Sequence, residues 1–242
     1  MDGYLLAVHL AVAVAALLQT ATGTGFGIIA GPVLLLAMNS GAAIQVTILL
    51  SWLVAALLAP SLYKQADKAL LARLLAGTLA GVPVGVFVFM QLGINVLKIT
   101  AGLSVLFMAC FVAGWSVFTA RRDTNPRDRL WDFGAGVASG AMSASLAMPG
   151  PAAVARMASL GRCKDTVRAT LLVLFFASYA AAIVFQAAMA GINADTLYFT
   201  ATLIPATLTG MVLGWKCVAW IGEAVFRKLI LAVLIATSVS LL

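Results

Sequence analysis

Residues 19–36 read Gln-Thr-Ala-Thr-Gly-Thr-Gly-Phe-Gly-Ile-Ile-Ala-Gly-Pro-Val-Leu-Leu-Leu, and this stretch decides the fold. Residues 3–63 around it contain no Asp, Glu, Lys or Arg, which is typical of a membrane segment. Its glycines and Pro32 disfavour a continuous helix, since interior glycine costs about 1 kcal/mol relative to alanine and proline removes a backbone donor. Broken backbone at membrane depth is tolerated only where protein or a water-filled cavity satisfies it. We therefore predict a broken helix of the kind that lines substrate sites in transporters.

The overall composition predicts a polytopic membrane protein. The 242 residues are 63% hydrophobic and 10% charged, with a mean hydropathy of +1.09, which is more apolar surface than a soluble core absorbs. The net charge of +7 falls in short loops between apolar runs, so we attribute it to membrane topology and expect no nucleic-acid partner. The three cysteines form no Cys-x-x-Cys pair, which favours neither a disulfide framework nor a metal site. No cofactor is expected.

The first half of the chain predicts a broken segment followed by three spans. Tyr4–Leu18 is shorter than the ~20 residues that a span needs, so we expect a half-length helix there and a second one, Phe26–Met38, after the break. Asn39 to Gly41 reads as a turn. The expected spans are Ala42–Leu62, Leu74–Leu92 and Val96–Thr119. Gly77, Gly81 and Gly85 in the second span form a small-xxx-small series, which lets helices approach closely.

The second half repeats this plan after a basic connection. We place the first repeat at residues 1–120, a cytoplasmic linker at 121–130 and the second repeat at 131–242. Trp131–Ala147 is expected as a short helix rich in small residues, residues 148–151 (Met-Pro-Gly-Pro) as its break, and Ala152–Leu160 as the return helix. The expected spans are Ala169–Ala190, Thr196–Trp215 and the apolar run at 229–242.

Four short matches align the two halves in the same order, which indicates an internal repeat. The paired segments, first half before second, are 25–27 with 149–151, 44–47 with 167–170, 81–85 with 210–214, and 97–98 with 227–228.

The basic residues decide how the repeats are oriented. If each broken segment returns to the side it entered from, each half crosses three times and the halves are inverted. All 15 Lys and Arg except Lys98 then face one side, whereas counting each broken segment as one crossing removes this bias. By the positive-inside rule that side is cytoplasmic, and both termini lie outside. The only early charge is Asp2, so we expect a retained N-terminus and not a secretory signal. We therefore predict an all-α polytopic membrane protein of two inverted repeats, each a broken, re-entrant helix hairpin followed by three transmembrane helices.

The broken segments suit a small anion. The N-terminus of a return helix presents unpaired N–H groups and about half a positive charge, and two such ends, near Phe26 and Ala152, would converge near the midplane. Glycine lets a ligand approach the backbone, and hydroxyl groups suit oxyanion oxygens. The alternative is that the hydroxyls and glycines only hold helices together. The substrate-binding candidates are Gln19, Thr20, Thr22, Gly23, Thr24, Gly25, Phe26, Gly27, Ser143, Ser145, Pro149 and Gly150.

Four further polar residues are considered individually. Gln45 and its repeat partner Arg168 are candidate substrate ligands, although Arg168 also fits a positive-inside residue at a span end. His9, the only histidine, is a candidate proton relay or a packing residue. Asp132 is expected to cap a helix or to pair with nearby arginines.

The chain resembles the sulfite exporter TauE/SafE family of bacterial membrane proteins over essentially its whole length. The resemblance rests on the two broken segments, the glycine-rich element from Gly23 to Pro32, and the glycine-rich spans around Gly81 and Gly210. The family usually shows Gly-Gly-Gly followed by proline in both halves, whereas Gly-Phe-Gly and Pro-Gly-Pro stand here. The resemblance implies transport of sulfite, organosulfonates or other small anions.

Together these features predict a secondary transporter that exports sulfite or an organosulfonate across the bacterial inner (plasma) membrane. Its expected partners are the small anion, the lipid bilayer, a coupling ion (H+ or Na+) and a second copy of the chain in a homodimer. An anion channel or a non-transporting membrane assembly factor is the alternative. An enzyme or thiol-redox carrier is disfavoured, because it would need paired cysteines or clustered His and carboxylates within the spans.

Overall fold

The computed structural model describes residues 2–114 and 128–217, and within these ranges every regular element is helical. This confirms the predicted all-α class. Phe26–Met38 and Ala42–Leu62 have the predicted bounds, whereas the run at 229–242 lies outside the described residues. The elements are α1 (Asp2–Thr22), α2 (Phe26–Met38), α3 (Ala42–Leu62), the short η1 (Tyr63–Gln65), α4 (Lys68–Gln91), α5 (Ile94–Gly114), α6 (Asp128–Leu146), α7 (Gly150–Ser159), α8 (Lys164–Met189) and α9 (Ala194–Cys217).

Five helices in the described ranges are long and apolar enough to cross a membrane. They are the segments Leu5–Thr22, Ala42–Gln65, Lys68–Gln91, Lys164–Met189 and Ala194–Lys216. Two shorter apolar helices accompany them, Phe26–Met38 and Ile94–Leu106. The chain is therefore a multi-pass membrane protein.

The helix before the first break is longer than predicted. The expected half-length helix, Tyr4–Leu18, is wrong, because α1 runs over 21 residues to Thr22, about 31 Å at 1.5 Å per residue. Its polar end stays helical because the side chains find partners: the Gln19 amide Nε2 donates to the Ser51 carbonyl (3.1 Å), and the Thr22 hydroxyl donates to the Leu18 carbonyl (2.8 Å). The first break is thus only residues 23–25, and the second is 147–149.

Both breaks have the same local geometry. α1 ends where the Gly23 N–H bonds the Gln19 carbonyl (2.8 Å), with Gly23 in the left-handed region (φ 83°). α6 ends where the Ala147 N–H bonds the Ser143 carbonyl (3.1 Å), with Ala147 also left-handed (φ 58°). These helix ends lie 124 positions apart, as do the starts of α2 and α7. The match supports the internal alignment made from the sequence.

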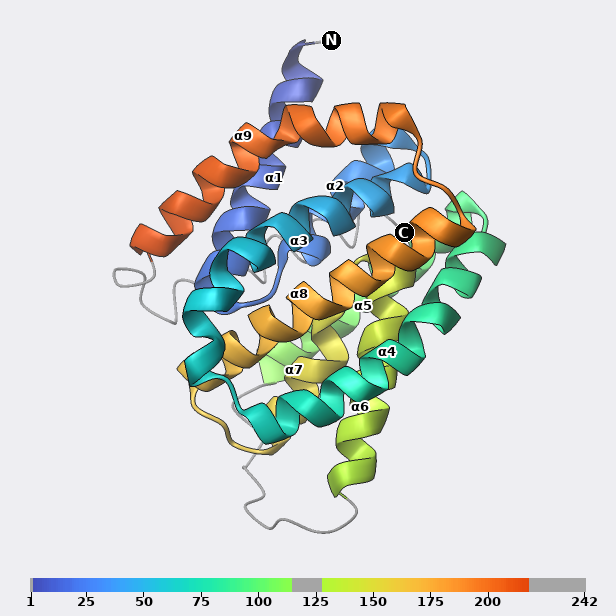
Figure 1. Ribbon diagram of the computed structural model, residues 1–242. Helices are drawn as coiled ribbons and strands as arrows, with labels where there is room; N and C mark the ends of the chain where they lie inside the picture. The colour runs from blue at the N-terminus through green and yellow to red at the C-terminus, as the bar shows by residue number, and fades with distance from the viewer. Residues whose placement is uncertain (1, 115–127, 218–242) are drawn as a thin grey trace.

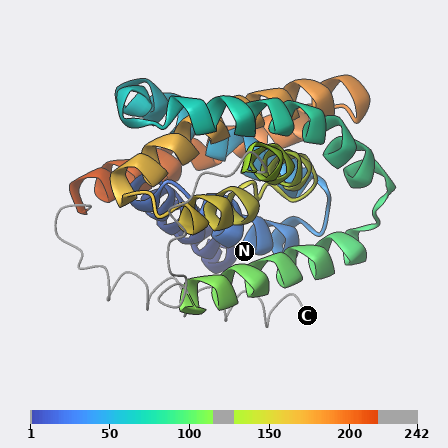
Figure 2. The same ribbon diagram turned by 90° about the horizontal axis from the view of Figure 1, so that it is seen from below.

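The helices of the two halves exchange packing partners. α4 of the first half packs along α6 of the second, α9 of the second packs along α1 of the first, and α3 and α8 run side by side between them (Figure 1). α1 and α2 form a V, and α6 and α7 pack together at the second break. Seen from below, α4 covers one face and α5 the opposite face (Figure 2). A two-fold relation between the halves produces such an exchange, and their inverted orientation in a membrane stays a prediction.

Glycine allows the exchanged helices to touch through their backbones. A Cβ atom at Gly77, Gly81 or Gly85 of α4 would overlap the backbone carbonyl of Phe133, Val137 or Ala141 of α6, respectively. On the other pair, a Cβ atom at Gly210 of α9 would overlap the Ala13 carbonyl of α1. The predicted close approach through the small-xxx-small series is confirmed.

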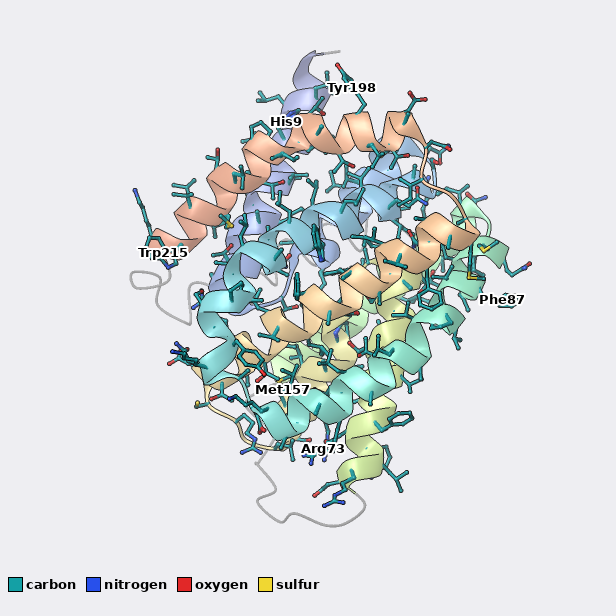
Figure 3. The ribbon with its side chains drawn as sticks, viewed as in Figure 1. His9, Arg73, Phe87, Met157, Tyr198 and Trp215 are labelled. Carbon is teal, nitrogen blue, oxygen red and sulfur yellow. The ribbon has the colours of Figure 1, made fainter. Side chains whose placement is uncertain are left out.

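Ion pairs hold Arg73, Arg156 and Arg162 together with acidic side chains at one end of the molecule. The Asp132 carboxylate of α6 accepts from Arg73 of α4 (2.7 Å) and from Arg156 of α7 (2.6 Å), as expected for this residue. Arg162, between α7 and α8, pairs with Asp67 beside α4 (2.7 Å). Arg73 lies at the bottom of Figure 3, far from His9 at the top. Lys98, the one basic residue predicted to face the opposite side, donates to Asn39 (2.8 Å) in the turn before α3. This turn precedes the start of α3, whereas the basic segment with Lys64 and Lys68 follows its end.

The glycine contact predicts a large effect of Gly81→Leu on stability. The side chain has no space beside the α6 backbone, so we expect a loss of at least about 2 kcal/mol and a clearly lower melting temperature in detergent. Gly134→Leu is the matched control, because a Cβ atom there meets nothing within 4 Å. Equal melting of the two variants would show that α4 does not pack through this face.

The topology can be read from one native thiol. Cys163 is exposed between Arg162 and Lys164, and the Thr166 hydroxyl, 3.1 Å from Sγ, lowers its thiol pKa. The thiolate is the reactive form, so labelling near neutral pH should be fast. In a Cys110→Ser/Cys217→Ser background, we expect an impermeant maleimide to modify inverted inner-membrane vesicles and not spheroplasts. Thr166→Val should move the labelling profile to higher pH. Labelling only in spheroplasts would reverse the predicted orientation.

Candidate functional site

The two breaks meet around one small cavity in the interior. Its volume, measured as the space open to the centre of a water molecule, is about 10 Å³, close to the minimum that one water needs. The lining comes from both breaks and from α8: Gln19, Thr24, Gly25, Phe26, Gly27, Ile28, Ala147, Met148, Pro149, Gly150, Phe175 and Tyr179. None of these side chains carries a formal charge at neutral pH.

Two contacts close the cavity between the return helices. The space that a Cβ atom at Gly27 would take is filled by the Ala147 carbonyl oxygen. The Thr24 hydroxyl oxygen lies 2.6 Å from where a Cβ atom at Gly150 would be. The start of α2 therefore touches the second break, and the start of α7 touches the first.

Side chains satisfy the carbonyl groups at the first break. The Thr22 hydroxyl lies within hydrogen-bond distance of the Leu18 carbonyl and of the Thr24 carbonyl inside the break (2.7 Å), and its single proton donates to one of them at a time. Arg168, at the start of α8, donates through Nε to the Thr20 carbonyl (2.9 Å). A cation at the C-terminal end of a helix also matches the negative end of the helix dipole.

The carbonyl groups at the second break are satisfied in the same way. The Tyr179 hydroxyl donates to the Ala147 carbonyl (2.9 Å), and the Gln186 amide donates to the Ala144 carbonyl (2.7 Å). The Ser139 hydroxyl donates to the Pro149 carbonyl (2.6 Å). Three of the five capping side chains at the two breaks, those of Arg168, Tyr179 and Gln186, come from α8.

Among the described residues, the N–H groups that follow each break lack the side-chain partners that the carbonyl groups have. The first N–H groups of any helix lack a partner within it, and Gly25, which precedes α2, supplies no side-chain cap. The first N–H seen to bond back across the start of α2 is that of Ile29, to the Gly25 carbonyl (3.1 Å). α7 begins Gly150-Pro151, where proline has no N–H to offer. Two positive helix ends therefore face one uncharged cavity.

Gln19 brings a further polar group to the cavity. Its side chain is 1% exposed, and its Nε2 donates to Ser51. Its Oε1 has no hydrogen-bond partner among the described residues. Thr20 and Ser143 are also buried with unpaired hydroxyls, but neither lines the cavity.

Gly23 lies beside the cavity and contacts a helix backbone. Its φ of 83° is one that only glycine adopts readily, and a Cβ atom there would come within 2.9 Å of the Arg168 Cα and carbonyl oxygen. This position packs the first break against α8.

Three other candidates lie away from the cavity. The Ser145 hydroxyl bonds the Ala141 carbonyl of its own helix (2.7 Å), and the Gln45 amide bonds the Gly191 carbonyl (2.8 Å) between α8 and α9. His9 Nδ1 bonds the Leu5 carbonyl (2.8 Å), and His9 lies toward the same end of the molecule as Tyr198 (Figure 3). It lies ten residues before Gln19, about 15 Å along the helix.

The sequence reasoning missed the contribution of α8. Tyr179 and Phe175 line the cavity, but the only sign of them in the sequence is the polar pair Ser178-Tyr179 in the middle of a mostly apolar span. A side chain in a span is by default a candidate for function when it can carry charge near neutral pH, and neither member of this pair is charged there. Within the described residues, no group of three or more His, Cys, Asp or Glu is placed to hold a metal ion.

A comparison with protein families identifies the family of this chain. The family model described as sulfite exporter TauE/SafE matches residues 8–241, which include both breaks. The chain belongs to the sulfite exporter TauE/SafE family. It is accordingly a multi-pass membrane protein of a transporter family, as the resemblance implied. Searches of curated proteins and of solved structures found no match to this TauE/SafE chain.

The contact between the breaks predicts coupled stability effects at Thr24 and Gly150. Gly150→Ala places a methyl group 2.6 Å from the Thr24 hydroxyl oxygen, so we expect a lower melting temperature. Thr24→Ala removes that oxygen, so the double variant should recover most of the loss, a coupling of about 1 kcal/mol. In the control cycle Gly134→Ala/Thr24→Ala the effects should add. Additivity in both cycles would contradict this contact.

Proposed function

We propose that this TauE/SafE protein is a secondary transporter that exports a small oxyanion, sulfite or an organosulfonate, across the bacterial inner membrane. In this proposal the end that holds Arg73 and Arg162 faces the cytoplasm, and both termini lie outside. One observation carries the proposal: side chains bond carbonyl groups at both breaks, whereas the first residues of α2 and α7 line the shared cavity and no side chain caps the start of α2.

This imbalance favours an anion over a cation. Unpaired N–H groups at membrane depth are costly, because no water reaches them. Oxyanion oxygens can accept from the starts of α2 and α7 at once, and both helix dipoles add to the attraction. The cavity lining carries no fixed charge, so no ion pair opposes release of the anion. Attraction from backbone dipoles alone suits a carrier, which must both bind and release.

The cavity must enlarge to bind its substrate. A volume suited to about one water is too small for a sulfite ion. The two contacts that close it, Gly27 with Ala147 and Thr24 with Gly150, are where the breaks must separate. Movement of one repeat against the other around a central site is the general behaviour of such transporters.

The test is flux in reconstituted liposomes with labelled sulfite, methanesulfonate, sulfate and acetate. We expect saturable uptake of sulfite or the sulfonate. Gly25→Val should abolish it, because φ at Gly25 is 116°, and Gly150→Val should abolish it by filling the cavity. Gly134→Val, an exposed change on α6, is the control and should leave flux unchanged.

Three outcomes would count against the proposal. Normal transport by both folded Gly→Val variants would place the site elsewhere. Flux that does not saturate would indicate a channel. A panel in which no anion moves or stabilises the protein would favour an assembly role for the chain.

A further inference from the structure

The cavity contains one buried hydrogen-bond acceptor that an ordinary anion cannot use. Gln19 lines the cavity, and its Oε1 has no partner among the described residues. The amide orientation is set by the Ser51 carbonyl, which is an acceptor and so must face Nε2 (3.1 Å). Turning the amide over would bring two oxygens together at Ser51.

Two hydroxyl groups share the lining with Gln19, those of Thr24 and Tyr179, and neither bonds its Oε1. The Tyr179 hydroxyl donates its proton to the Ala147 carbonyl at 2.9 Å. The cavity thus combines N–H donors at the starts of α2 and α7 with an unpaired acceptor on α1. An anion whose oxygens only accept would satisfy the donors but place its charge against Oε1.

We propose that Gln19 selects the singly protonated form of an oxyanion. The O–H of the ligand donates to Gln19 Oε1, while its remaining oxygens accept from the two helix N-termini. This inference rests on the proposed function and narrows it: hydrogen sulfite carries such a proton, whereas an organosulfonate at neutral pH does not.

In the same arrangement, the proton for proton-coupled transport is carried by the substrate itself. No side chain that lines the cavity exchanges a proton near neutral pH, since the only ionisable one, that of Tyr179, is a buried phenol. A proton that stays on the substrate crosses with it and leaves when the anion re-equilibrates on the far side. His9, well away from the cavity, takes no part in this step.

A matched pair of ligands tests the inference on the purified parent protein. Methylphosphonate monoanion and methanesulfonate have closely similar shapes and the same charge; apart from phosphorus in place of sulfur, they differ by one acidic hydrogen. By calorimetric titration we expect the monoanion to bind at least tenfold more tightly, because the sulfonate leaves a buried acceptor unpaired. Raising the pH until methylphosphonate becomes a dianion should remove the preference, whereas methanesulfonate binding should stay constant.

Gln19→Met tests which residue makes the choice. It keeps the side-chain length and removes the acceptor, so the preference should fall to less than twofold. Ser178→Ala is the control, because Ser178 is buried, its hydroxyl has no hydrogen-bond partner within the described ranges, and it does not line the cavity. It should keep the parent preference.

The outcomes separate this inference from the function it rests on. Equal binding of both ligands by the parent overturns the role of Gln19 and leaves the anion site standing. Absence of binding by either ligand, with sulfite also inactive, overturns the proposed function. The parent comparison decides the matter even if Gln19→Met does not fold. If the Gln19→Met variant folds and keeps the tenfold preference, a group other than Gln19 recognises the acidic hydrogen of the ligand.

Discussion

The fold depends on how backbone groups are satisfied where two helices break at membrane depth. No water is available there, so each exposed carbonyl needs a partner from the protein. α8 supplies most of them: Arg168 bonds a carbonyl before the first break, and Tyr179 and Gln186 bond carbonyls at the second. One straight helix thus runs past both interruptions. Because it completes the carbonyl ends only, the N–H ends set the electrostatic character of the cavity.

Close backbone packing keeps the interrupted helices in place. In lipid there is little hydrophobic force between helices, so van der Waals contact has to hold them. Gly81 on α4 and Gly210 on α9 each remove the side chain that would separate the two backbones. Asp132 adds a buried carboxylate between Arg73 and Arg156, which joins α4, α6 and α7. Loss of one partner from such a group is costly, because the remaining charge stays buried.

Sequence reasoning located the elements well where the signal was local. The limits of α2 follow from the glycines before it and the Asn39 turn after it, and both were predicted. The extension of α1 was not, because the partner that keeps Gln19 helical, Ser51, lies on another helix. The same limit affected the site. The break residues that line the cavity stand in two short stretches, 24–28 and 147–150, whereas Tyr179 reaches it only through the tertiary fold, and Gln45 bonds Gly191 instead.

The packing also determines which parts can move together. The contacts that close the cavity are few and involve small groups, Gly27 with Ala147 and Thr24 with Gly150. The contacts between α4 and α6, and between α1 and α9, are backbone to backbone over several turns and leave no space for sliding. In the proposed transport cycle, separation of the breaks would therefore carry α4 with α6 and α7, and α9 with α1 and α2. Each of these two groups would include one helix from the opposite half of the chain, so a substrate that separated the breaks would act on both repeats at once.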